Sequence, residues 1–388
     1  MEWEWPSIQN ADDMIEVREV RTRRERREFL EFPNKLYKGC PYYVPPLYMD
    51  ERKIFRKDYV YYDTCEAVYL NAYKDGVMAG RISGIIQRAS NEKWGQKRVR
   101  FTRFETVRDF EVAKALFRTV EEWAVGKGME EACGPMGFSD FEREGLLTDG
   151  FDQMSTFEEA YNYDYYPEFI ERLGYVMETE WEESQIRLSK DPEQLEEMEK
   201  MAAFVLKRYK LHLGPSKNGK DFLKRYADGF FEIVDKSYDK IYGTVPFTER
   251  MKKMAMDNFA LILDNKHAGV VLDENDRVIA LGLCFPCIAR PMQVAGGHLT
   301  PLALLKTLKA IKHPDVIDLG LIGVDPAYLN CGVSIVIANE LARMLKDPHI
   351  KYADTNLNLV DNAAIINLWK RFDAKKNKHR KAYVKKLV

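Results

Sequence analysis

The sequence has 388 residues, of which 46 % are hydrophobic and 31 % are charged, as is typical of a folded globular protein. At roughly 100–200 residues per domain, this length predicts two or three domains. The net charge of −2 excludes a global electrostatic preference for nucleic acid or an anionic membrane. No apolar run approaches the roughly 18 residues that span a bilayer. Met1–Pro6 lacks the basic and apolar regions of a secretory leader, so we expect a cytoplasmic protein.

The six cysteines are too few, in a chain of this length, for a disulfide scaffold. Cys284 and Cys287 form a Cys-x-x-Cys pair, but no second pair of ligands accompanies them. The stretch Val278–Cys284 has the pattern of a buried strand that Pro286 ends, so we expect both cysteines to pack in the core. The six histidines are scattered singly, and no metal site is expected.

The first half of the chain begins with a short strand and a charged helix, continues with a hairpin, and then alternates strands with helices. The turn at Asp75-Gly76 between two apolar runs is a strong hairpin signal. The expected strands are Ile15–Val20, Ala67–Tyr73, Val77–Ile86, Val99–Val107, Glu131–Cys133 and Trp181–Leu188. The expected helices are Arg23–Tyr37, Asp109–Lys127 and Tyr165–Leu173.

A domain boundary is expected at residue 189, because Asp191 and Pro192 form a helix start. Helices then dominate as far as Asn258. The strands expected beyond them are Ala268–Leu272, Val278–Cys284, Val316–Val324, Tyr352–Leu359 and one within Lys375–Leu387. The helices expected there are an inserted one at Leu302–Ile311, then Gly332–Leu345 and Ala363–Phe372. Both halves share the order hairpin, strand, helix, strand, helix, strand, offset by about 200 residues, which indicates a duplication.

The segment Val324–Ser334 carries the sharpest chemical signal. A strand, a short loop containing Gly332 and a helix N-terminus together form an anion cradle, since the helix start offers unpaired N–H groups and a partial positive charge. The loop is neither a Walker A motif nor a dinucleotide-binding glycine motif. Taken alone, the segment also fits an ordinary strand-to-helix turn.

This segment resembles motif A of the GNAT (N-acetyltransferase) superfamily, whose loop amides bind the pyrophosphate of acyl-CoA. Val324, Pro326 and Tyr328 match the motif, as does Gly332, whereas Leu329 replaces its usual Arg or Gln. Asn362–Phe372 and Phe169–Tyr175 resemble the superfamily's last helix, once in each half. The resemblance implies acyl-CoA contacts at Val324, Tyr328, Leu329, Asn330, Cys331, Gly332, Val333, Ser334 and Asn362.

The resemblance covers most of both halves and implies an α/β fold with a mixed sheet, built as two tandem GNAT-like domains, residues 1–189 and 190–388. In the first half, Asp109 and Glu111 stand where the phosphate loop would lie. Acidic residues there cap a helix and repel a pyrophosphate. We therefore expect only the second half to bind acetyl-CoA or a longer acyl-CoA, and the first half to hold the acceptor.

A second segment, Gly134–Asp152, is a long loop at the end of a strand, where α/β sheets usually hold ligands. It resembles a stretch found in a bacterial group of double GNAT proteins of unsettled substrate. Its polar residues are candidates for binding an amine or a zwitterion: Ser139, Asp140, Glu142, Arg143 and Glu144. The alternative is a self-packed loop held by Phe138, Phe141 and Leu146.

The resemblance implies direct attack of the amine on the thioester, and a covalent acyl-enzyme is disfavoured because no Ser or Cys triad is visible. Asp318 and Glu105, on corresponding strands, are candidates for the base, and each also fits a structural role. Tyr166, in a cluster of tyrosines, is a candidate for protonating the leaving thiolate, with core packing as the alternative. The slots where many GNAT enzymes carry this tyrosine hold Ile170 and Trp369.

The tail Lys375–Lys386 is the strongest charge run of the chain. Contact with the 3′-phosphate of CoA is one interpretation. A solvated edge strand, protected by its lysines from pairing with other chains, is the favoured one.

The sequence thus predicts an N-acyltransferase, in the simplest case an N-acetyltransferase, that moves an acyl group from acyl-CoA to a small-molecule or peptide amine. A non-catalytic acyl-CoA-binding or sensing protein is the alternative, because Leu329 and the missing tyrosine also fit degenerate sites. A third possibility, an aminoacyl-tRNA-using relative of the peptidoglycan-bridge enzymes, requires a basic groove that the balanced charge does not support. No nucleic-acid or membrane partner is expected, and the oligomeric state is left open.

Overall fold

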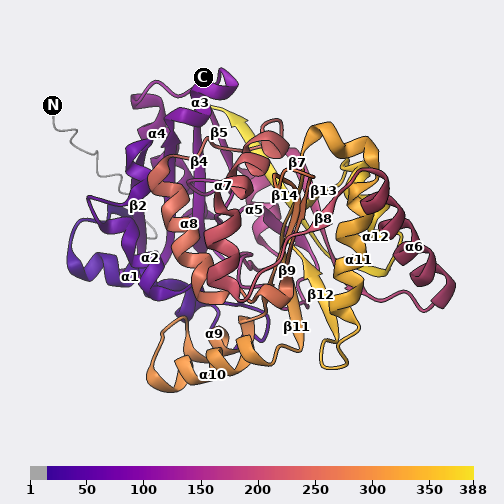
Figure 1. Ribbon diagram of the computed structural model, residues 1–388. Coiled ribbons are helices and arrows are strands. Elements are labelled where there is room, and N and C mark those ends of the chain that lie inside the picture. The colour runs from indigo at the N-terminus through magenta and orange to yellow at the C-terminus, as the bar shows by residue number, and fades with distance from the viewer. Residues whose placement is uncertain (1–14) are drawn as a thin grey trace. The chain divides into compact units, whose positions relative to one another are not determined.

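The computed structural model describes residues 15–388 and has the expected mixed α/β architecture (Figure 1). Met1–Pro6, on which the expectation about a leader rests, lies outside the described residues. The chain forms two compact units. The first contains the residues up to Glu180, with Gly296–His298 and Arg380–Val388; the second contains Trp181–Ala295 and Leu299–His379. The division therefore falls after Glu180, within a strand, and not at residue 189, and the last residues of the chain belong to the first unit.

The first unit is built on strands in the order β1-β2-β3-β4-β5, in which only β4 and β5 are parallel. The predicted hairpin is confirmed, because Asp75 and Gly76 both have positive φ, as a tight two-residue turn requires. The apolar face of α4 packs into the core of this unit. The elements are β1 (Ile15–Glu19), α1 (Arg23–Leu36), α2 (Tyr48–Glu51), β2 (Cys65–Lys74), β3 (Val77–Gln87), α3 (Arg88–Trp94), β4 (Arg98–Thr106), α4 (Phe110–Gly126), β5 (Glu131–Gly134), β6 (Leu146–Asp149) and α5 (Tyr166–Arg172).

The second unit carries strands in the order β7-β12-β11-β10-β9-β8. Its strands are β7 (Val176–Arg187), β8 (His212–Leu213), β9 (Ala268–Leu272), β10 (Val278–Pro286), β11 (Val316–Val324), β12 (Tyr352–Thr355), β13 (Asn358–Leu359) and β14 (Asp373–Lys386). Its helices are α6 (Pro192–Arg208), α7 (Gly219–Tyr238), α8 (Glu249–Ile262), α9 (Ala289–Ala295), α10 (Pro301–Lys312), α11 (Val333–Leu345) and α12 (Ala363–Trp369). β7 and β14 each contribute residues to both units.

The sheet of the second unit has helices on both faces. On one face α11 packs against β10, and a Cβ built on Gly282 would lie 3.4 Å from a methyl group of Ile337. On the other face α7 packs against β10 and β11, and a Cβ on Gly323 would lie 2.7 Å from Ile233. Glycine at position 323 is therefore required by the close approach of α7.

The predicted order of hairpin, strand, helix, strand, helix and strand is confirmed in both halves of the chain. Several boundaries differ from prediction, and β7 differs most, because it begins at Val176 rather than at Trp181. β10 continues through Pro286 instead of stopping before it, and the strand expected over Tyr352–Leu359 is interrupted between β12 and β13. In residues 15–388 no helix is both long and apolar enough to cross a membrane.

The prediction that the basic tail forms a solvated edge strand is wrong. β14 has β5 and β7 as its neighbours, so it is an interior strand. The side chain of Lys378 is fully buried, and its Nζ lies 2.5 Å from Oε2 of Glu183 on β7. Lys376, two residues earlier, is exposed and pairs with Glu182. Lys378 therefore compensates the charge of a buried carboxylate, whereas Lys376 makes an ion pair at the surface.

Replacing Lys378 with Met removes the cation that faces Glu183 in the interior. Because a buried carboxylate is then left uncompensated, we expect the free energy of unfolding to fall by on the order of 3 kcal/mol. Lys376→Met is the matched control, since its ion pair is solvent-exposed and should contribute at most about 1 kcal/mol. Urea denaturation measures both, and equal losses would contradict the interior position of β14.

Candidate functional site

The two parallel strands β11 and β12 diverge near the middle of the second unit. In the described residues they pair only over Val316–Leu319 and Tyr352–Thr355. Beyond Leu319, β11 continues for five residues beside β10 alone. The result is a fork, open on the side of β11 that faces away from β10.

A bulge in β11 lies at the fork. The register with β10 shifts so that Gly320 is the extra residue, and a Cβ there would lie 2.4 Å from the ring of Phe285. A bulge bends its strand and redirects the groups that follow it. Only glycine fits this point of β11 without displacing the aromatic ring.

Three carbonyl groups of β11 are hydrogen-bonded by side chains at the fork. Gly320 O accepts from Asn356 Nδ2 at 3.3 Å, Ile322 O from the Tyr238 hydroxyl at 3.1 Å, and Val324 O from Ser237 Oγ at 3.0 Å. Among residues 15–388, no donor reaches the buried Oδ1 of Asn356. A secondary amide of a pantetheine arm offers the N–H that this oxygen lacks, so the fork fits such a ligand.

The loop after β11 leads into α11 through the short 3-10 helix η4 (Pro326–Cys331). Gly332 has φ +73°, a left-handed conformation that favours glycine. No side chain of the described residues caps α11, and Gly332 and Ser334 are exposed. The backbone N–H groups at this helix start are therefore accessible to an anion.

Eight of the nine predicted acyl-CoA residues lie around this helix start, and they differ in how far they are exposed. Leu329 and Asn330 are exposed, whereas Val324 and Val333 are buried in the core at the two ends of the loop. Tyr328 and Cys331 pack against the core of the unit. Asn362 lies at the start of α12, where its Oδ1 accepts the Ile365 N–H at 3.3 Å, so its side chain serves as a helix cap.

The corresponding helix start in the first unit is closed. Asp109 caps α4 by accepting the Glu111 N–H at 3.0 Å, and it pairs with Lys74 at 2.8 Å. Burial raises the pKa of Asp109, but the contacts with Lys74 and the backbone outweigh it, so its pKa is below the ordinary value. The Asp109 carboxylate thus caps the start of α4, whereas the corresponding start of α11 has no side-chain cap.

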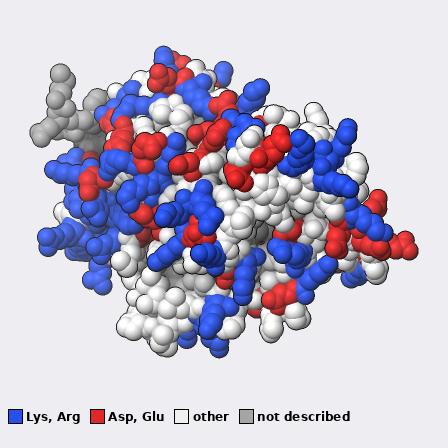
Figure 2. Space-filling view, in the orientation of Figure 1, with Lys and Arg blue, Asp and Glu red and all other residues white. Residues whose placement is uncertain are grey.

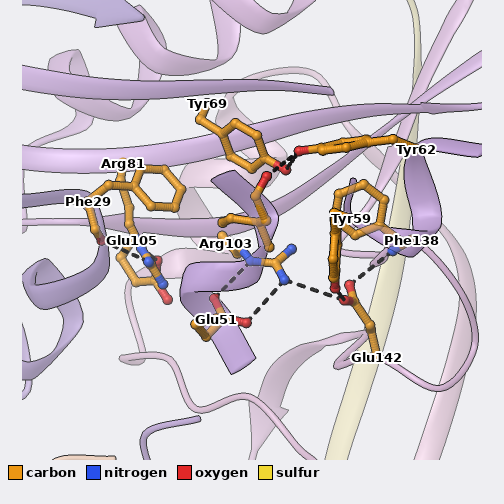
Figure 3. Close-up of polar contacts among 11 residues, drawn as sticks. Phe29, Glu51, Tyr59, Tyr62, Tyr69, Arg81, Arg103, Glu105, Phe138 and Glu142 are labelled. Carbon is orange, nitrogen blue, oxygen red and sulfur yellow. Dashed lines mark hydrogen bonds and ion pairs between the residues drawn. The ribbon is translucent and has the colours of Figure 1, made fainter. Parts of the chain in front are cut away.

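The fork of the first unit is also filled. β4 and β5 pair only over Arg98–Arg100, and β4 then carries a bulge at Arg103, which has φ +49°. Figure 3 shows the Arg103 guanidinium between two carboxylates: its Nε and Nη2 donate to Glu51 at 3.0 and 3.1 Å, and Nη2 lies 3.5 Å from Glu142. Glycine in β11 and arginine in β4 therefore stand at equivalent bulges.

The loop Gly134–Asp152 directs most of its predicted acceptor-binding residues inward. Ser139 Oγ bonds the Tyr61 hydroxyl at 2.8 Å, and the Arg143 guanidinium donates to two backbone carbonyls. Glu142 accepts the Phe138 N–H at 3.0 Å in addition to its pairing with Arg103. Phe138 itself is buried and packs against Tyr59, Tyr61 and Tyr62. These contacts favour the self-packed interpretation of the loop, and the acceptor role of Ser139, Asp140, Glu142 and Arg143 stays a prediction.

Two of the candidate catalytic residues lie in the first unit and have structural partners. Glu105 pairs with the buried Arg81 at 2.5 Å. The Tyr166 hydroxyl accepts the Thr106 N–H at 2.9 Å, and its ring is fully buried. Both contacts favour packing over chemistry. The third candidate, Asp318, is buried on β11, two residues before the bulge at Gly320.

The structure adds residues that the sequence did not single out. Asp354 on β12 is the register partner of Asp318, so the two residues lie side by side on neighbouring strands, one rung before β11 and β12 diverge. Burial raises the pKa of Asp354 to about 6, Glu183 adds to the rise, and Lys378 opposes it. In the sequence, Asp354 is distinguished only as a single acidic residue within the short strand β12. No sequence signal marks Tyr238, which reaches the fork from α7.

The carboxylates and α11 lie on opposite faces of the sheet. Ile317, Leu319 and Ala353 belong to the core beneath α11, so their chain neighbours Asp318 and Asp354 point to the other face. In residues 15–388 no group of histidine, cysteine and acidic side chains could hold a metal ion.

Comparisons with known proteins bear on the fold of the chain. No known protein-family profile matches the sequence. The chain is 25 % identical over 372 residues to Protein YghO of Escherichia coli strain K12, covering 92 % of both proteins. A tandem GNAT protein from the clavulanic acid biosynthesis pathway aligns with a TM-score of 0.57 and 9 % identity, over 97 % of this chain and 99 % of that one.

A GCN5-related N-acetyltransferase from Sphaerobacter thermophilus also aligns, with a TM-score of 0.52 and 12 % identity over 96 % of both chains. Each alignment extends across both units, which accounts for the doubled order of elements. The forks and the helix starts beside them recur in both units for the same reason. The chain has the tandem GNAT fold.

Proposed function

We propose that the protein is an N-acyltransferase whose second unit binds an acyl-CoA and passes the acyl group to an amine, a small molecule or a peptide. The observation that carries the proposal is the uncapped start of α11 beside an open fork. The first unit, with a capped helix and an arginine-filled fork, has neither feature. Acyl-CoA, as the co-substrate, supplies an activated thioester.

The proposed binding mode follows the strand edge. The backbone N–H groups of Gly332, Val333 and Ser334 would receive the pyrophosphate, where the helix dipole favours negative charge. The pantetheine arm would run along β11, with Asn356 pairing to one of its amides. The thioester would then lie at the Gly320 bulge, where the ring of Phe285 is close to the strand.

The proposed chemistry is direct attack. The amine nitrogen bonds to the thioester carbon, and a β11 backbone N–H polarises the carbonyl oxygen as an oxyanion hole does. The proton leaves the nitrogen for the Asp354 carboxylate, the C–S bond breaks, and the thiolate takes a proton from the Tyr238 phenol or from water. Holding both substrates on one fork supplies much of the rate through proximity.

Several groups surround Asp354 and set its proton affinity. Lys378 and Asn377 approach from β14, Glu183 and Arg187 from β7, and Asp318 from β11. The thiol of Cys287, after β10, contacts Asp318. With three buried carboxylates and one buried lysine, one carboxyl group holds its proton more tightly than usual. A base with a pKa of about 6 is ionised at neutral pH and still accepts a proton effectively.

A non-catalytic acyl-CoA sensor is the second candidate. The exposed Leu329, where motif A usually has Arg or Gln, favours it, because the loop lacks a polar side chain toward the phosphates. The two candidates differ in turnover: a sensor binds the thioester without releasing free thiol. Thiol release from acetyl-CoA, measured with a panel of amines, separates them.

Gly332→Asp places a carboxylate at the proposed phosphate site. We expect it to weaken binding of acetyl-CoA and of a long-chain acyl-CoA at least ten-fold by calorimetry, through repulsion of the pyrophosphate. Gly332→Asn is the matched control, since it has the same shape without the charge and tolerates positive φ. If the native protein binds neither thioester, the proposed function is wrong.

Asp354→Asn tests the base. Thiol release by the native protein should increase as pH rises through about 6, because the carboxylate must be ionised to accept a proton. The variant should lose roughly a hundred-fold in rate and lose this pH dependence, while still binding acetyl-CoA. Asp315→Asn, an exposed acid just before β11, is the control. An unchanged pH profile in Asp354→Asn would exclude this residue as the base.

The same pKa has a consequence for stability. Because the folded-state pKa of Asp354 lies above the ordinary value of 3.8, ionisation disfavours the folded state. Its contribution to the free energy of unfolding is therefore greatest below pH 4 and declines as pH rises toward 6. Urea denaturation of native protein and Asp354→Asn measures this contribution: the free energy of unfolding of the native protein, relative to that of the variant, should fall as pH rises across this range.

A further inference from the structure

The segment that joins β10 to β11 exposes an apolar helix face. It consists of α9 and α10, whereas the equivalent link between β3 and β4 contains only the short α3. Four leucines of α10 are exposed: Leu302 (63 %), Leu304 (45 %), Leu305 (65 %) and Leu308 (51 %). Val294 of α9 and Leu299 between the helices extend the same surface. Figure 2 shows uncharged atoms covering the part of the molecule that α9 and α10 occupy in Figure 1.

The packing of α10 is inverted relative to an ordinary surface helix. Its buried positions are Ala303 and Thr307, and the Thr307 hydroxyl donates to Ala303 O at 2.9 Å. Small residues thus face the protein while large apolar residues face outward. Contiguous exposed apolar surface of this kind marks an interaction site, because water contact with so many leucines is unfavourable.

The charge of the segment has one sign. Arg290, Lys306, Lys309 and Lys312 are its ionised residues, and residues 289–314 contain no Asp or Glu. The three lysines follow one another at helical spacing along α10, beside the leucines. The net charge of the whole chain, −2, conceals this local excess of positive charge.

We propose that α9 and α10 dock on the surface of a bilayer containing anionic phospholipid. The leucines of α10 enter the boundary between headgroups and acyl chains, and the lysines contact the phosphates, as in interfacial amphipathic helices. A second copy of the chain is a poorer occupant, because a symmetric contact would bring two exclusively basic segments together. The contact is peripheral, since no helix in residues 15–388 can cross the membrane.

The test is flotation of the full-length protein with vesicles of phosphatidylcholine alone or mixed with phosphatidylglycerol. We expect binding to the mixed vesicles and at least ten-fold weaker binding to phosphatidylcholine alone or at high salt. The double variant Leu302→Glu/Leu305→Glu should weaken binding at least ten-fold. Lys306→Gln and Lys309→Gln should each weaken it about five-fold.

The control is Leu261→Glu on α8, where a comparably exposed leucine (73 %) receives one of the two charges that the double variant adds. Its vesicle binding should equal that of the native protein. Unchanged melting curves should accompany every variant, since all the altered side chains are exposed. The proposal is overturned if the native protein does not float with the mixed vesicles, or if the leucine variants float as well as the control. The face would instead belong to a second copy if the native protein did not bind vesicles, if sedimentation detected a dimer, and if the double variant abolished that dimer.

Discussion

The divergence of β11 from β12 is the constraint on which the second unit depends. Pairing stops at Leu319, and the bulge at Gly320 leaves the following edge of β11 without a neighbouring strand. Backbone polar groups on such an edge require partners. Ser237 and Tyr238 supply hydroxyl donors to two carbonyls, and Asn356 supplies an amide to a third. A ligand that carries its own amides can pair with this edge as a strand would, which is the physical basis of the proposed donor site.

The two units differ in what lies at the point where their parallel strands diverge. In the first, the side chain of Arg103 fills the fork, and Glu51 and Glu142 compensate its charge. Burial raises the pKa of Glu51, but the arginine charge outweighs it and the pKa is lowered, so the pair is ionised in the folded protein. Opening this fork would require separating buried charges, at a cost of several kcal/mol. The first unit is thereby committed to a closed form, whereas the bulge in β11 of the second unit carries a glycine and no charged side chain.

Local sequence signals predicted the framework well. The bounds of the strands Ala268–Leu272 and Val316–Val324 agree with the structure, because apolar runs between turn residues determine them. The exposed glycine before α11 was also predictable, since a strand, a glycine and an apolar helix follow one another in the chain. The closure of the first unit's helix by Asp109 followed from capping preferences alone.

Contacts between distant segments could not be predicted in the same way. Lys378 was assigned to a solvated edge because its own segment is basic, and its neutralising partner Glu183 is almost 200 residues earlier. Asp354 becomes a candidate base only when β11, β7 and β14 surround it. The pairing of strands across the chain, rather than any motif, decides which charges are buried together, so no local pattern contained this information.

The insertion that carries the proposed membrane contact is joined to the strands that carry the proposed chemistry. It leaves β10 at Pro286 and returns at Val316, and these ends are adjacent because Pro286 is the register partner of Ile317. Asp318 lies two residues beyond Val316, and its register partner Asp354 is beside it. The two ends of the insertion are therefore anchored on β10 and on the strand that carries Asp318. The first unit has only α3 at this position and a closed fork, so both of the features proposed as functional occur on the same pair of strands in the second unit.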